Sequence, residues 1–161
     1  MMKVLFVCLG NICRSPLAEA IFLHKIKEKG LENDFQASSC GTADYHIGDP
    51  PDPRTIRNAA KNGIEIHHVC RQLTNSDLDN FDLIVAMDKS NYISILNLKN
   101  ASANAHKIFL MREFDSRGTG EDVPDPYSGR EQDFQEVFEI LDWSIDGLIE
   151  YLKKTLNIGD T

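Results

Sequence analysis

The feature that most constrains the fold is a short apolar run that passes through a polar loop into a helical pattern. Residues 3–8 read Lys-Val-Leu-Phe-Val-Cys, which is typical of a strand buried on both faces. The loop Leu-Gly-Asn-Ile-Cys-Arg follows, and then Ser15 and Pro16, a favourable N-cap and first helical residue. A strand that is followed through a short loop by a helix predicts a parallel α/β unit.

The same alternation continues along the chain. Apolar runs predict further strands at residues 35–40, 82–87 and 107–111. Helices are predicted from residue 15 to a stop at Gly30, over residues 55–62 with a stop at Gly63, and over residues 88–98, with polar loops at 44–54 and 115–129. A last helix is predicted from the apolar stripe Phe134, Val137, Phe138, Leu141, Ile145, Leu148 and Leu152. This order predicts a parallel sheet covered by helices on both faces, with ligands at the carboxyl ends of the strands.

Composition restricts the classes of protein to which this chain can belong. A chain of 161 residues with 42 % hydrophobic residues fits one domain, here residues 1–161. A net charge of -8 argues against a general nucleic-acid partner. No signal peptide or membrane span is expected, which favours a cytoplasmic location. The four cysteines are interpreted as thiols, and without a Cys-x-x-Cys pair no structural zinc site is expected.

The loop from Cys8 to Arg14 has the pattern of an oxyanion cradle. If it curls around one point, its backbone N–H groups and the start of the following helix attract an anion. Arg14 can clamp two oxygens of a phosphoryl group, which a lysine cannot. Gly10 allows close approach of the backbone, and Asn11 tolerates left-handed dihedrals. The same positive field favours the thiolate of Cys8, and the hydroxyl of Ser15 can hydrogen-bond to it.

Residues 8–20, Cys-Leu-Gly-Asn-Ile-Cys-Arg-Ser-Pro-Leu-Ala-Glu-Ala, resemble the signature of the low-molecular-weight protein tyrosine phosphatases. Residues 39–54, 82–91 and 123–127 resemble further segments of that family, so the resemblance covers essentially the whole chain. It implies a single-domain, three-layer α/β fold with a four-stranded parallel sheet. It also implies metal-independent hydrolysis of phosphotyrosine in proteins through a cysteinyl-phosphate intermediate, with no cofactor, and activity on small aryl phosphates.

A phosphate ester also needs a proton donor for its leaving oxygen. Asp125 lies between two prolines and before Tyr127, and Pro126 restricts it to extended dihedrals. From the residues alone, Asp125 is either part of a common turn or this donor. The resemblance implies the second role, with Asp125 serving next as the base for water. Many relatives carry two adjacent tyrosines after Asp-Pro, where this chain has Tyr127-Ser128.

Other residues are expected to support the site. Tyr45 and Tyr127 are either half-exposed loop aromatics or the walls of an aromatic slot, and the resemblance favours the slot. It also implies that Asn11, Ser39 and His68 bond together and hold the cradle. Cys13 either fills space or traps an oxidised Cys8 as a disulfide. The expected phosphate-binding loop and its supports are Leu9, Gly10, Asn11, Ile12, Cys13, Ser15, Ser39 and His68.

Three alternatives share the fold or the pocket. A thioredoxin-coupled arsenate reductase needs further cysteines, and Cys70 is the only candidate. Protein arginine phosphatases are more similar, but typically carry Thr where this chain has Ile12, which favours an aryl ester. A non-catalytic phosphoprotein-binding module would be expected to lose Cys8 or Asp125, and both are present.

Overall fold

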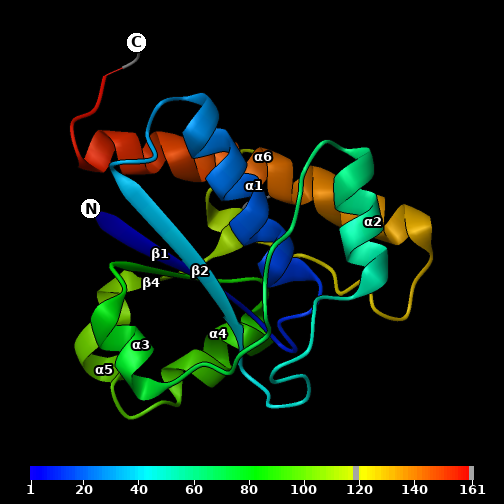
Figure 1. Cartoon of the computed structure of the whole chain (residues 1–161). Helices are drawn as coiled ribbons and strands as arrows, with labels where there is room; N and C mark the ends of the chain where they lie inside the picture. Colours follow the sequence, from blue (N-terminus) through cyan, green and yellow to red (C-terminus); the bar gives the residue numbers. More distant parts are fainter. Residues whose placement is uncertain (118–119, 160–161) are drawn as a thin grey trace.

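The computed structural model describes residues 1–117 and 120–159. Its centre is a sheet of four parallel strands, shown in Figure 1. The strands are β1 (Met2–Cys8), β2 (Phe35–Gly41), β3 (Leu83–Ala86) and β4 (Ile108–Leu110), in the order β2-β1-β3-β4. Strand β1 therefore lies inside the sheet, between β2 and β3. The four-stranded parallel sheet predicted from the apolar runs is confirmed.

Helices cover both faces of the sheet, which confirms the three layers (Figure 1). On one face lie α1 (Arg14–Glu28) and α6 (Glu131–Thr155), and α2 (Pro53–Lys61) packs against α6. On the other face lie α3 (Asn75–Asn80), α4 (Lys89–Leu96) and α5 (Ala101–Asn104). No helix among the described residues is both long enough and apolar enough to span a bilayer.

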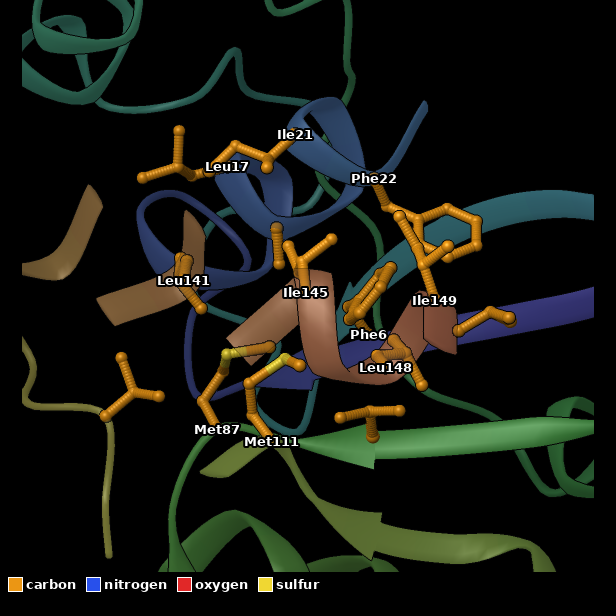
Figure 2. Packing of buried hydrophobic residues seen from close by; sticks show 14 of the residues in the cluster. Phe6, Leu17, Ile21, Phe22, Met87, Met111, Leu141, Ile145, Leu148 and Ile149 are labelled. Atoms are coloured by element: carbon orange, nitrogen blue, oxygen red, sulfur yellow. The ribbon is translucent and has the colours of Figure 1, made fainter. Parts of the chain in front are cut away.

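Alternation along β1 divides the core in two. Val4 and Phe6 pack toward α1 and α6, whereas Leu5 and Val7 pack toward the opposite helices. Figure 2 shows the first cluster, where Phe6 lies among side chains of α1 and α6. Every residue of the predicted α6 stripe is buried. Because β1 is paired on both sides and its residues 4–7 are completely buried, it can position the loop that follows it.

The start of the first helix and the ends of the fourth strand differ from the predicted boundaries. Helix α1 begins at Arg14, with Cys13 as its N-cap, so Ser15 lies within the first turn and does not cap the helix. The predicted fourth strand at 107–111 is shorter, because 3-10 turns at Ala105–Lys107 and Met111–Glu113 flank it. The stops at Gly30 and Gly63 are confirmed, with φ of 70° and 80°.

Two short helices were not predicted. Helix α3 has only 6 residues and α5 only 4, too few for an apolar period to show. The start of α3 does carry a local signal, since Thr74 and Asp77 form a capping box. Both helices cover the face of the sheet away from α1 and contribute Leu78 and Ala101 to the second core cluster.

Candidate active site

Cys8 ends β1 at the carboxyl edge of the sheet, where the loop to α1 begins. Its side chain is buried, and its sulfur lies 2.9 Å from Ser15 Oγ and accepts a hydrogen bond of 3.3 Å from the backbone N–H of Asn11. Ser15 Oγ accepts from Asn11 Nδ2 at 2.8 Å, and its own proton can point at the sulfur or at the carbonyl oxygen of Cys40, 3.4 Å away. The sulfur therefore has one backbone N–H donor and one hydroxyl beside it.

Asn11 is the residue on which the loop turns. It has a φ of 58°, a left-handed conformation that few non-glycine residues adopt. Neighbouring groups hold it there: its Oδ1 accepts from the backbone N–H of Arg71 at 3.0 Å, and its carbonyl accepts from Cys70 Sγ at 2.8 Å. Contacts from a distant segment thus fix the turn, and Asn11 itself is completely buried.

The side chain of Asn11 belongs to a polar network whose other members do not line the pocket. His68 Nε2 donates to Asn11 Oδ1 at 2.7 Å, and Asn11 Nδ2 donates to Ser39 Oγ at 3.1 Å. Ser39 Oγ donates to Glu19 Oε1 at 2.7 Å. Burial raises the pKa of Glu19, while burial and the charge of Arg71 lower the pKa of His68. His68 Nδ1 also lies 3.4 Å from Glu19 Oε1. The structure thus brings Asn11, Ser39 and His68 together in one polar network, the grouping that the resemblance implied.

Arg14 opens α1 and is 3 % exposed, with its guanidinium at the same edge of the sheet as Cys8. One nitrogen, Nη1, donates to Asp88 Oδ2 at 2.6 Å and to the carbonyl of Val123 at 3.0 Å. The other, Nη2, lies 3.7 Å from Asp125 Oδ2. Burial disfavours its charge, but Cys8, Asp88 and Asp125 favour it and raise the pKa of Arg14 above its ordinary value. Arg14 is thus a permanent, oriented cation.

A pocket of about 300 Å³ opens above this loop. Two tyrosines, Tyr45 and Tyr127, form part of its wall and are 69 % and 52 % exposed. Asp125 also faces it, with a side chain 46 % exposed and Oδ1 accepting from the backbone N–H of Tyr127 at 3.1 Å. The complete lining is Cys8, Leu9, Gly10, Ile12, Cys13, Arg14, Tyr45, His46, Asp125 and Tyr127. Cys8 and Arg14 therefore line the same pocket as the two tyrosines.

Residues 3–157 match the family model described as low molecular weight phosphotyrosine protein phosphatase. The chain belongs to this family. A low molecular weight phosphotyrosine protein phosphatase from Schizosaccharomyces pombe is 46 % identical over 144 residues, which cover 88 % of this chain and 92 % of that protein. A crystal structure of a protein tyrosine phosphatase from Entamoeba histolytica has a TM-score of 0.93 at 38 % identity, covering 97 % of this chain and 99 % of that chain. The arginine phosphatase YwlE is also similar, with a TM-score of 0.86 at 26 % identity, and the alignment covers 98 % of this chain and 100 % of that chain.

Like Cys8, the other three cysteines of this phosphatase are free and buried. Burial raises the pKa of Cys13 to about 12 and that of Cys70 to about 11, and it raises the pKa of Cys40 further. Thiols with such values remain protonated near neutral pH and are poor nucleophiles. Cys13 shares the pocket but lies at the start of α1, away from the end of β1.

Several residues at the phosphatase site were not predicted. Asp88 forms the ion pair with Arg14, Glu19 anchors Ser39, and His46 lines the pocket over Gly10. The sequence did hold a signal for Asp88. It comes two residues after the end of β3, as Gly10 does after β1, and parallel strands end at one edge of the sheet. Glu19 and His46 are set by tertiary packing, which their neighbours in sequence do not reveal.

Gly41 ends β2 against the catalytic loop of the phosphatase. A Cβ at this position would lie 2.7 Å from the carbonyl oxygen of Leu9 and 3.1 Å from the backbone nitrogen of Asn11. We expect Gly41→Ala to displace the loop, lower kcat, and reduce the free energy of unfolding by about 1–3 kcal/mol. Denaturant unfolding and aryl phosphate kinetics measure both effects. Gly159→Ala is the control, since a Cβ at Gly159 would meet no atom of the other described residues within 4 Å. Equal results for the two variants would contradict the close approach.

Proposed function

We propose that this chain hydrolyses phosphotyrosine in proteins through a phosphorylated Cys8. The observation that carries the proposal is the convergence of Cys8, Arg14 and Asp125 on one pocket between two tyrosines. Cys8 is held beneath the pocket by the donors of the loop, and Arg14 is charged and fixed by Asp88. Such an arrangement positions a phosphoryl group for attack from one side.

In the first step, the Cys8 thiolate attacks phosphorus and forms the S–P bond. The bond between phosphorus and the tyrosyl oxygen breaks, and the leaving oxygen takes the electron pair and a proton from Asp125. The guanidinium of Arg14 and the N–H groups of the loop balance the charge on the three remaining phosphoryl oxygens. Because Asp125 reaches the pocket beside Tyr127, it is suited to the leaving group that stacks there.

In the second step, water attacks the phosphocysteine and Asp125 takes a proton from it. The S–P bond breaks, inorganic phosphate forms, and the electron pair returns to Cys8 as a thiolate. Ser15 assists this departure, since its hydroxyl lies 2.9 Å from the sulfur and is oriented by Asn11. Both steps use the same acid–base group, so Asp125 ends the cycle protonated as it began it.

The pocket favours an aryl ester over a phosphoarginine. Ile12 contributes an apolar side chain to the wall, where arginine phosphatases typically carry Thr, and Tyr45 and Tyr127 provide ring faces. We propose that small aryl phosphates are also substrates, since the pocket itself requires only the ring and the phosphate. Phosphotyrosine proteins and phosphate are the expected partners, in the cytoplasm, where free thiols such as these four stay reduced.

Hydrolysis assays on the purified protein, in the presence of a metal chelator, test this assignment. We expect hydrolysis of an aryl phosphate and of phosphotyrosine peptides, with much slower release of phosphate from phosphoarginine peptides. Arsenate supplied with thioredoxin should remain unreduced, because burial keeps Cys70 protonated and no other cysteine lies on its segment. A preference for phosphoarginine, or reduction of arsenate, would assign the pocket to the corresponding alternative.

Asp125→Asn tests the proton donor. We expect kcat to fall by roughly 10²–10⁴ for leaving groups that need protonation. The loss should shrink for a phenol of low leaving-group pKa, which departs without a proton, and the basic limb of the pH profile should flatten. Vanadate affinity should change less than kcat. A leaving-group series on wild type and variant distinguishes this role from a purely structural turn, which predicts the same loss for every phenol.

A further inference from the structure

A second, smaller cleft lies beside the active-site pocket, between α2 and the start of α6. Its volume is about 200 Å³, and we call it the α2–α6 cleft. The residues that line it are Arg54, Arg57, Asn58, Lys61, Glu131 and Phe134. Asn58 and Phe134 are buried and form its floor, while the side chains of Lys61 and Glu131 are 63 % and 70 % exposed at its rim. The cleft is therefore open to a macromolecule and has a cationic edge.

Arg54 connects this cleft to the active-site pocket. Its Nη2 donates to the carbonyl of Tyr127 at 2.9 Å, and its guanidinium carbon lies 5.4 Å from the centre of the Tyr127 ring. The same guanidinium lies 4.7 Å from the ring centre of Phe134, on the floor of the cleft. Since Tyr127 forms a wall of the active-site pocket, a chain leaving that pocket over Tyr127 meets the α2–α6 cleft next.

The charges of the cleft are not balanced. Asp52 forms an ion pair with Arg54, and Glu131 forms one with Lys61. Within the described part of the chain, Arg57 has no salt-bridge partner. Its charge adds to the effect of Arg54 in lowering the pKa of Asp52, and to that of Lys61 in lowering the pKa of Glu131. The cleft thus keeps about one positive charge in a protein of net charge -8.

The spacing along α2 suits an extended peptide. At about 1.5 Å per helical residue, Arg57 and Lys61 lie about 4.5 and 10 Å beyond Arg54 along the helix. An extended peptide advances about 3.3 Å per residue. From a residue over Arg54, an extended peptide therefore reaches Arg57 and Lys61 within about one to three residues. We propose that the α2–α6 cleft binds an acidic side chain of the phosphoprotein substrate, close in sequence to the phosphotyrosine, with Arg57 as the main contact. This inference rests on the proposed phosphotyrosine phosphatase activity and adds a preference for acidic flanks.

Matched phosphotyrosine peptides test the preference. One pair carries three Glu or three Gln residues before the phosphotyrosine, and a second pair carries them after it. For the flank that crosses α2, we expect kcat/KM at low salt to be about three- to tenfold higher with Glu, and the advantage to shrink as salt is added. No advantage for Glu in either pair, or an advantage insensitive to salt, would overturn the inference.

Variants then assign the preference to the cleft. Arg57→Glu should abolish or reverse the Glu advantage, and Glu131→Gln, which frees Lys61, should increase it. Lys99→Glu is the control, since it makes the same charge change in the turn after α4, on the opposite face of the sheet. If Lys99→Glu reduces the advantage as much as Arg57→Glu does, overall charge is responsible and the cleft is not.

An aryl phosphate, too small to reach the cleft, separates this inference from the proposed function. Wild-type protein that fails to hydrolyse it refutes the phosphatase assignment itself. Wild-type protein that hydrolyses it, but treats Glu and Gln peptides alike, refutes only the binding of an acidic flank. Each variant is assayed on the same compound, so that a damaged active site is recognised before peptide ratios are compared.

Discussion

Cys8→Ser is expected to eliminate turnover, lowering kcat by ~10⁴-fold or more, as replacement of a covalent nucleophile does in other enzymes. A serine hydroxyl is a far weaker nucleophile than a thiolate at neutral pH. The rest of the cradle stays in place, because Asn11 is held from His68, Cys70 and Arg71, and not by the sulfur alone. Phosphate or vanadate should therefore still bind, which isothermal titration measures alongside single-turnover kinetics.

Cys13→Ser is the matched control for that experiment. Burial raises the pKa of Cys13 to about 12, so its thiol is protonated and the variant should keep most of its kcat. If Cys8→Ser turned over normally, the covalent mechanism would be wrong. If both variants lost phosphate binding, the damage would lie in the shape of the loop and not in the nucleophile.

Arg14→Lys should be nearly as damaging as Arg14→Ala, with kcat/KM lower by about 10³-fold. In the native protein, one guanidinium nitrogen serves Asp88 and the carbonyl of Val123, which leaves Nη2 directed toward Asp125 and the pocket. A lysine has one nitrogen. It can pair with Asp88 or contact a phosphoryl oxygen, but it cannot present a planar fork to two oxygens while its other edge is held.

Steady-state kinetics and vanadate titration of Arg14→Lys and Arg14→Ala show whether position 14 needs the planar guanidinium or only a positive charge. Asp88→Asn is the companion variant, because it removes the ion pair and keeps Arg14. We expect it to lose much less activity than Arg14→Lys. A lysine variant that retained most of the wild-type kcat would show that charge alone suffices at position 14.

The fold and the loop were predictable because their signals are local. Strand β1 is an unbroken apolar run, α6 carries one apolar stripe, and Cys8 and Arg14 are separated by five residues of a single loop. The prolines around Asp125 left a common turn open as well, and only the resemblance of its segment indicated a place at the pocket, which Asp125 does line. These features survive in the sequence because each is built from residues close together along the chain.

The remainder of the site depends on contacts that no local pattern records. Ser15 looked like an N-cap, yet its hydroxyl lies beside the sulfur of Cys8, because α1 starts two residues earlier than its propensities indicate. Glu19 lies on α1 and meets Ser39 only because β2 pairs with β1. Gly41 gave no signal either, since its importance lies in the Leu9 carbonyl beside it.

The position of β1 in the sheet has a consequence for when activity arises during synthesis. Strand β1, which carries Cys8, needs β2 on one side and β3 on the other, and both follow it along the chain. Asp88, which holds Arg14, follows after 80 more residues, and Asp125 comes later still. A nascent chain therefore carries Cys8 long before it can use it. Because α6 packs in the same core cluster as Cys8 and α1, we expect a chain truncated before this last helix to be silent rather than unregulated.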